Sequence, residues 1–358
     1  MAKRDDSSTE PAEWEPIIKG IDTEETEITS LSLDDSGQFF FVGRSDGSLS
    51  FSETASGQQR KVLYRHNYQL SVTSIAWGSQ RHVIASSDTA CRFIVCALLL
   101  DPGGGWKVAS KHMDRKADSM VRQLLLDLSN NILLVSTEKS NSVWNVHTRQ
   151  LLSTQTWQPP LSFSWFNHPG SSEHRTLVTT TTAALFDWKS CAEFQSPASF
   201  HAPEDHAMIS QTWRVKNAFA FAQDRLLVVE FSRLYEERST TETLLLNLQP
   251  FDSSGGSFLT PATGFSDLTN KIKHVIGGYG AWLLFVDASR WVCSMDTSHA
   301  DSKHYVRHFP IPSAWQSQQR ILRMAVTRNG DILFVRTNEV AVISHGLDFE
   351  ERVLLDLE

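Results

Sequence analysis

The stretch LSLDDSGQFFFVGRSDGSLSFSETASG, residues 31–57, decides the fold class of this chain. Short apolar segments alternate in it with turns, and each turn ends in a glycine, at Gly37, Gly47 and Gly57. Glycine adopts the positive φ that tight hairpins require. The stretch therefore predicts consecutive antiparallel strands and not helices.

One motif inside this stretch permits a second interpretation. GRSDG, residues 43–47, has the glycine–serine–glycine spacing of a serine-hydrolase nucleophile elbow. Such an elbow places its serine between a strand and a helix, so that the hydroxyl stands exposed on a strained turn. The residues that follow here, SLSFSE, alternate with a period of two, as a strand does. We therefore predict that GRSDG is a hairpin turn.

The same plan recurs along the chain. Groups of strand-like segments begin near residues 28, 72, 121, 161, 208, 271 and 320, and most groups contain four segments. Four-stranded units at a period of about 40–60 residues are typical of an all-β β-propeller, in which each sheet forms one blade. A blade has two apolar faces and covers both only by stacking between neighbours. We predict seven blades, with six or eight as alternatives because the fifth group is weakly patterned.

The domain organisation follows from this count. We expect residues 13–358 to form a single propeller, residues 1–12 to be a disordered tail, and residues 249–270, rich in Gly, Ser, Pro and Thr, to be a mobile loop. Two segments compete to supply the outer strand of the last blade. They are FEERVLLDL, residues 349–357, and EWEPIIKG, residues 13–20.

The composition and the short motifs limit the classes of function that the chain can have. The net charge is −8, with 41% hydrophobic and 21% charged residues, which disfavours a nucleic-acid binder because neutralising phosphates needs a basic surface. No apolar run is long enough to cross a bilayer, and the four cysteines show no CxxC pairing. The glycine cluster GGGWK, residues 103–107, lacks the spacing of a phosphate loop. We expect a cytoplasmic protein that binds no cofactor, no nucleic acid and no membrane.

Histidines and tryptophans are the remaining candidates for chemistry. His201 and His206 flank an acidic pair and could approach a metal ion, but a solvated acidic loop is the commoner outcome, and we predict no metal site. The eleven tryptophans could form an aromatic cage for a cation, although core packing is the default because most lie inside strand patterns. Trp106, Trp157 and Trp315 lie nearer loops and are expected to be the exposed ones.

The opening unit resembles a WD-type repeat. TSLSL, residues 29–33, is followed by an aspartate–glycine turn, by FFFVG, residues 39–43, and by SDGSLSF, residues 45–51, while Trp144 in VWNV falls where that repeat carries its tryptophan. No unit carries the full histidine, aspartate and tryptophan set. The resemblance implies that Asp46, and Asp88 at the corresponding place in the second unit, brace their blades.

The last third is similar to the tail of fungal NACHT-type, NLR-like receptors that carry C-terminal WD repeats. The residues that carry this likeness are IKHVIG, LLFVD, WVCSMD, YVRHFPIPSAW and MAVTRNGDILFVRTNEVAVI, between residues 272 and 343. The resemblance implies a ligand-sensing or autoinhibitory region of a receptor for non-self recognition. These receptors also carry a nucleotide-binding module, and this chain contains no phosphate loop.

Together these observations predict a non-catalytic platform, monomeric as an isolated domain, that binds a protein or peptide partner on one rim of the ring. Two alternatives stay open: a constitutive scaffold subunit, and a propeller hydrolase with a metal in its channel. Each rim candidate could instead be a solvated or blade-bracing residue. The candidates are Arg44, Asp46, Tyr68, Asp88 and Arg122.

Overall fold

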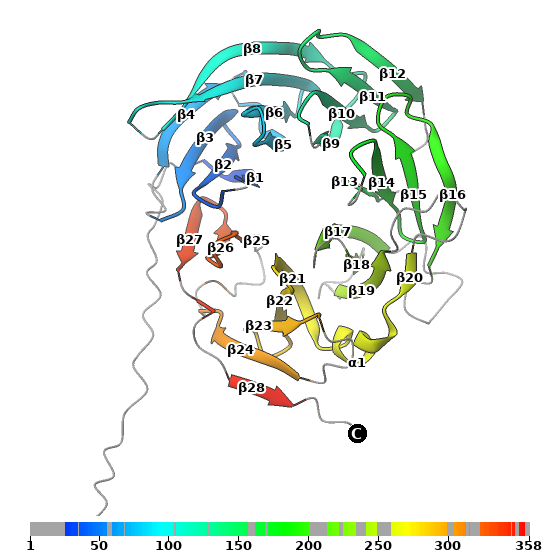
Figure 1. The fold of residues 1–358 in the computed structure, drawn as a ribbon. Helices are drawn as coiled ribbons and strands as arrows, with labels where there is room; N and C mark the ends of the chain where they lie inside the picture. The colour runs from blue at the N-terminus through cyan, green and yellow to red at the C-terminus, as the bar shows by residue number, and fades with distance from the viewer. Residues whose placement is uncertain are drawn as a thin grey trace, which may run out of the picture.

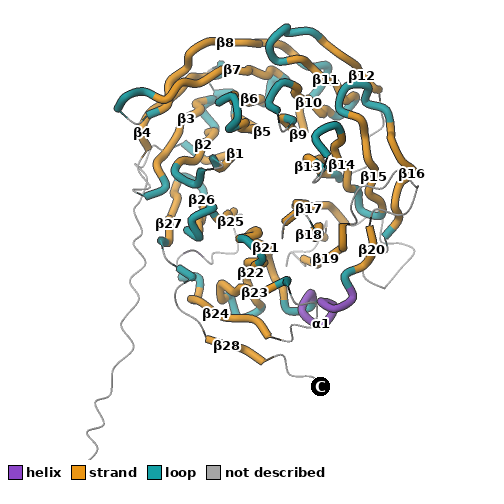
Figure 2. Tube along the Cα trace, in the orientation of Figure 1, coloured by secondary structure: helices purple, strands orange, loops and turns teal. Residues whose placement is uncertain are grey.

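The computed structural model describes residues 26–354, except residues 35, 56–58, 68, 104, 128, 157–161, 169–170, 201–212, 222–224, 234–240, 249–258, 299–303, 313–314, 316–322, 345 and 348–350. In this part of the chain seven antiparallel sheets stand in a ring around a central axis (Figure 1). Almost all regular structure is strand, and the one α-helix is a short turn at the edge of the ring (Figure 2). The predicted all-β propeller with seven blades is confirmed.

The first four blades each contain four strands in chain order. Blade 1 contains β1 (Ile28–Leu33), β2 (Phe39–Arg44), β3 (Ser48–Glu53) and β4 (Gln59–Arg65). Blade 2 contains β5 (Val72–Gly78), β6 (Val83–Asp88), β7 (Arg92–Leu100) and β8 (Trp106–Lys116). Blade 3 contains β9 (Val121–Leu126), β10 (Ile132–Thr137), β11 (Ser140–Asn145) and β12 (Leu151–Thr156). Blade 4 contains β13 (Ser164–Asn167), β14 (His174–Val178), β15 (Thr182–Asp187) and β16 (Glu193–Ser199).

The other three blades differ in strand number within the described residues. Blade 5 contains β17 (Trp213–Phe221), β18 (Leu226–Arg233), β19 (Thr241–Leu248) and β20 (Leu259–Pro261). Blade 6 contains β21 (Ile272–Tyr279), β22 (Trp282–Asp287), β23 (Trp291–Asp296), β24 (His304–Pro310) and, as a fifth strand, β28 (Glu351–Leu354). Blade 7 contains β25 (Arg323–Val326), β26 (Ile332–Arg336) and β27 (Glu339–Ile343). The first strand of every blade lies nearest the axis (Figure 1).

Buried apolar side chains explain why the blades form a ring. Seven clusters of them occur in the described part of the chain, and each lies between two neighbouring blades. Strand β2 shows how the sequence produces this arrangement. Phe39 and Phe41 pack toward blade 2, whereas Phe40 and Val42 pack toward blade 7, because successive side chains of a strand point to opposite faces. A run such as FFFV therefore suits a strand that is buried on both sides.

The C-terminal segment does not complete the last blade, which corrects one of the two expectations for the outer strand of that blade. The C-terminal strand β28 pairs with β24 of blade 6, from His304 opposite Leu354 to Arg307 opposite Glu351, and not with blade 7. The chain passes close to blade 6 on this route, since a Cβ added at Gly346, just after β27, would lie 2.8 Å from the Phe309 ring of β24. The chain leaving β27 is thus held against blade 6. Residues 13–20 lie outside the described residues.

Blades 1 and 7 meet through side-chain packing and backbone contacts. Phe40 and Val42 of blade 1 lie in one apolar cluster with Leu333 and Val335 of blade 7. The amide of Ile28 donates to the carbonyl of Thr337 at 2.5 Å. Closure therefore rests on the same apolar packing that joins the other blades.

Residues 249–270 are not a loop throughout, which corrects the expectation for this segment. Residues 249–258 lie outside the described part of the chain, but the rest forms β20, a 3-10 turn η2 (Thr263–Phe265) and α1 (Ser266–Thr269). Leu259, Phe265 and Leu268 are buried in the clusters on either side of blade 5. Their apolar side chains fold this segment onto the ring although its composition favours a loop. The expected tail, residues 1–12, also lies outside the described residues.

Candidate functional site

The strand order places the predicted rim residues on one face of the ring. Successive antiparallel strands run in opposite directions, so each blade's second-to-third-strand turn lies on the same face as the connections between blades. We call this the linker face, and it carries residues 45–47 and 66–71. Arg44, Asp46, Asp88 and Arg122 all lie at strand ends or turns on this face. Tyr68 lies outside the described residues.

GRSDG is a hairpin turn, as predicted. It joins β2 to β3, Gly47 has φ of +85°, and its amide donates to the carbonyl of Arg44 at 3.1 Å. Asp46 Oδ1 accepts from the amide of Ser48 at 2.9 Å and from its hydroxyl at 2.6 Å, and Arg65 binds Oδ2. Burial alone would raise the pKa of Asp46, but the bonds from Ser48 and Arg65 lower it. The carboxylate braces the turn, and no helix follows the serine.

Arg44 and Asp88 are buried, which corrects their interpretation as surface contacts. Arg44 is 1% exposed and donates to the carbonyl of Thr26 at 2.9 Å. Asp88 accepts from the amides of Ala90 at 2.9 Å and Arg92 at 3.0 Å, and its other oxygen lies 3.0 Å from His66 Nδ1. Both side chains therefore brace their blades, which was the alternative interpretation of these rim candidates.

A buried polar chain links blades 1 and 2 behind Asp88. His66, in the connection between the blades, also lies 2.7 Å from the Ser86 hydroxyl, which in turn lies 2.9 Å from the Tyr64 hydroxyl. Burial lowers the pKa of His66 although the neighbouring Asp88 carboxylate acts to raise it. The four side chains pair with one another, so they fix the angle between two blades and leave no free nucleophile or base.

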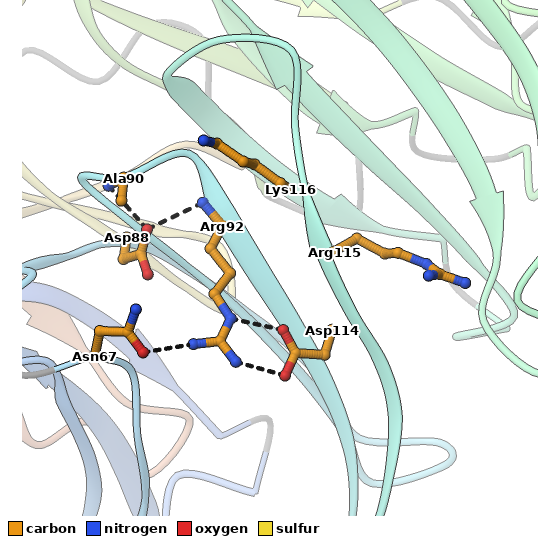
Figure 3. Close-up of a pocket in the computed structure, with 7 residues that line it drawn as sticks. All are labelled: Asn67, Asp88, Ala90, Arg92, Asp114, Arg115 and Lys116. Carbon is orange, nitrogen blue, oxygen red and sulfur yellow. Dashed lines mark hydrogen bonds and ion pairs between the residues drawn. The ribbon is translucent and has the colours of Figure 1, made fainter.

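Next to these four side chains lies an open hollow of about 280 Å³, which we call the Arg92 hollow (Figure 3). Arg92 Nε and Nη2 donate to the two carboxylate oxygens of Asp114, both at 2.6 Å, and Nη1 donates to Asn67 Oδ1 at 3.0 Å. Lys116 extends over the hollow, and Arg115 points away from it (Figure 3). The two-pronged bond from Arg92 lowers the pKa of Asp114 to about 2, against the effect of burial. The guanidinium is already satisfied inside the chain.

Arg122 is the candidate that remains most exposed. It lies 3.4 Å from Glu138, and the two side chains are 40% and 47% exposed. Exposed pairs of this kind contribute little to stability because solvent screens them. Contact of a partner with Arg122 or Asp46 stays a prediction.

The histidine and tryptophan expectations met different outcomes. His201, His206 and Trp157 lie outside the described residues. Trp106 and Trp315, which were expected to be exposed, are 6% and 7% exposed and pack between blades, so that expectation was wrong. Within the described ranges, no three His, Cys, Asp or Glu side chains gather closely enough to hold a metal ion. No helix of that part is long and apolar enough to cross a membrane.

Comparison with known proteins agrees with this architecture. The fold defines the chain as a seven-bladed β-propeller. The chain is similar to the β-propeller domain of Cps50 (Swd1) from Myceliophteria thermophila, with a TM-score of 0.61 and 11% sequence identity over 89% of this chain and 97% of that one. At this identity the likeness shows the fold alone. No family model and no curated protein matches the chain. Because 1510 solved chains match the structure, the fold by itself selects no function.

Proposed function

We propose that this protein is a non-catalytic protein-interaction platform. The observation that carries the proposal is the linker face of blades 1 and 2, where the turns are held by buried or paired polar groups. Asp46, Asp88 and Arg92 each make two or more hydrogen bonds within the chain. A rigid surface of this kind binds a partner with little rearrangement and therefore with a small entropy cost.

Two forms of the platform are supported by different observations. The resemblance of residues 272–343 supports a ligand-sensing region of a fungal NLR-like receptor that acts in the cytoplasm. The internal pairing of the linker face supports a constitutive scaffold subunit, because a sensor requires an element with two arrangements. Between the two we favour the scaffold, since Asp88 and the guanidinium of Arg92 are already bonded within the chain.

A propeller hydrolase is the weaker alternative. It requires a nucleophile or a set of metal ligands, and the serine of GRSDG lies in a hairpin between two strands. Elemental analysis of the purified full chain tests this alternative. A stoichiometric bound metal would revive it.

Affinity purification of the tagged full chain from its source organism, with chemical crosslinking, tests the platform. One partner at constant stoichiometry in every growth condition is the result expected for a scaffold. A partner that appears only after a challenge would support the sensor form. If no protein crosslinks to the linker face or to any other surface of the ring, the proposal fails.

A further inference from the structure

The opposite face of the ring carries a second and larger hollow, of about 650 Å³. We call this side the hairpin face because it carries the turns between the first and second strands of each blade. The hollow lies between the β21–β22 turn of blade 6 and the β25–β26 turn of blade 7. Tyr279, Trp282 and Arg328 line it, and we call it the Tyr279 hollow. Its volume lies within the range of about 300–1,000 Å³ of ligand sites in proteins.

Two glycines place β21 so that this hollow forms. A Cβ at Gly277 would lie 2.8 Å from Val326 of blade 7, and a Cβ at Gly278 would lie 2.5 Å from Phe221 of blade 5. Only glycine permits an inner strand to approach both neighbours this closely. The turn that follows, Gly280–Ala281, therefore stands in a fixed position, with open space above Gly280, where a Cβ would meet no atom within 4 Å.

Both walls of the hollow are held by internal hydrogen bonds. In the blade 6 turn, the amide and hydroxyl of Thr297 donate to the carbonyl of Ala281, at 2.9 and 2.6 Å. In the blade 7 turn, the Thr327 hydroxyl accepts from the amides of Asn329 and Asp331. Arg328 projects from a turn that is already ordered, so binding there would not have to order the backbone.

Trp282 and Arg328 are the exposed side chains of this hollow, whereas Tyr279 packs partly against the apolar cluster between blades 6 and 7. Trp282 is 37% exposed, and it is the one tryptophan among the exposed large hydrophobic residues of the described chain. Arg328 is exposed, and the side chains of Arg328 and Trp282 have no hydrogen-bond or ion-pair partner among the described residues. Asp296, opposite Trp282 on β23, accepts bonds from Ser298 and does not line the hollow. Trp, Tyr and Arg are the residues that most often dominate the energy of protein interfaces.

We propose that the Tyr279 hollow binds a linear segment of a partner protein in which an apolar side chain lies next to an aspartate or glutamate. The apolar side chain packs against the rings of Tyr279 and Trp282, and the carboxylate pairs with Arg328. The positive charge of Arg328 disfavours a cationic guest such as a methylated lysine, which the two rings alone would suit. This inference rests on the proposed function and specifies one binding surface and the chemistry of its partner.

The test starts with selection of random linear peptides, displayed on phage, against the immobilised full chain. The selected peptides should share an apolar residue beside an acidic one. Their affinities are then measured by fluorescence polarisation for wild type and variants. Trp282→Ala should weaken binding by about 30-fold or more, as truncation of an interface anchor does. Arg328→Glu should weaken the same peptides, and replacing the peptide's acidic residue with lysine should restore binding to this variant.

Two control variants change the same kinds of side chain, an exposed aromatic ring and an exposed arginine, away from the Tyr279 hollow. Phe194→Ala deletes an aromatic side chain that is 52% exposed on β16 of blade 4, and Arg149→Glu reverses an exposed arginine in the β11–β12 turn of blade 3. Both should bind the selected peptides like wild type, and thermal unfolding should match for all variants. Failure to enrich any peptide, equal binding by wild type and Trp282→Ala, or a cationic consensus would overturn the proposal. If the Trp282→Ala/Arg328→Glu double variant retains every partner captured from the source organism, the platform stands and this site does not.

Discussion

Both hollows of the ring are lined by an arginine, but they differ in how the charge of that arginine is used. In the Arg92 hollow, the guanidinium is bound on three nitrogens by Asp114 and Asn67. In the Tyr279 hollow, Arg328 has no such partner among the described residues, and it lines the same hollow as Tyr279 and Trp282. An arginine that is already satisfied stabilises the fold, whereas one that is exposed and unpaired on an ordered turn is suited to a ligand. The difference separates the linker face, which we call the bracing face, from the hairpin face, which we call the binding face.

The largest expected loss of stability comes from replacing Asp88, which accepts the buried hydrogen bonds of the bracing face. Asp88→Ala removes the acceptor for two amides and for His66, all in a buried position. Leaving these groups without a partner should lower the free energy of unfolding by about 3–5 kcal/mol. Urea unfolding of the full chain measures this loss. Arg328→Ala, the matched change in the Tyr279 hollow, should shift the value by less than about 0.5 kcal/mol. Equal losses from the two variants would contradict the comparison.

Acidification should lower the stability of the fold through its buried histidines at a higher pH than it affects the Arg92–Asp114 pair. Burial, assisted by the charge of His174, lowers the pKa of His168 to about 4. The folded chain then binds this proton less tightly than the unfolded chain, whose pKa is about 6.5, so stability falls as the pH drops through this window. His168 should account for about 3 kcal/mol of that fall.

The measurement compares unfolding of wild type and His168→Gln at pH 7.5 and pH 4.5. The glutamine variant should lose less stability on acidification, because its side chain does not titrate. Asp114, whose pKa is about 2, should stay ionised in this range, so the cost of Asp114→Asn should be the same at both pH values. A wild type and a glutamine variant with parallel pH dependence would refute the assignment to His168.

The close approach of β21 to its neighbours should produce a smaller loss. Gly278→Ala places a Cβ 2.5 Å from Phe221, so blades 5 and 6 must move apart at a cost of about 1–3 kcal/mol. Gly103→Ala is the control, since a Cβ there meets no atom within 4 Å. Chemical denaturation compares the two. If Gly278→Ala is as stable as Gly103→Ala, the glycines do not set the position of the Tyr279 hollow.

Strands and turns were predictable from the sequence because their signals are local. The seven starting points and the GRSDG hairpin follow from alternation and from turn chemistry within a few residues, whereas the bracing by Asp46 was implied by the resemblance to a WD-type repeat. The Arg92–Asp114 pair was not predictable. Two register shifts between β7 and β8, at Cys96 and at Leu98, alter which residues face each other, and nothing in either strand alone reveals them. Register, rather than strand identity, limits the prediction of the site.

Two further features could not be predicted because they depend on packing between segments far apart in the sequence. Leu259, Phe265 and Leu268 lie in a segment of loop-like composition, and their burial depends on contacts with blades 4, 5 and 6. The exposed Trp282 was missed for the same reason, since WLLFVD has the pattern of a buried strand and only its first residue lies at the open end of the sheet. Local composition reports neither case.

The smallest expected effect concerns Arg122, the exposed candidate on the linker face. Its partner Glu138 lies 3.4 Å away, and both side chains are largely in solvent, so the pair should contribute less than about 1 kcal/mol to stability. A double-mutant cycle with Arg122→Ala and Glu138→Ala measures the coupling, which salt should abolish because exposed charges are screened. A coupling well above that limit would mean that this pair braces blade 3 as Asp88 braces blade 2. A negligible coupling combined with loss of partner crosslinking in Arg122→Ala would instead show that the linker face also binds, and the division between bracing and binding faces would fail at blade 3.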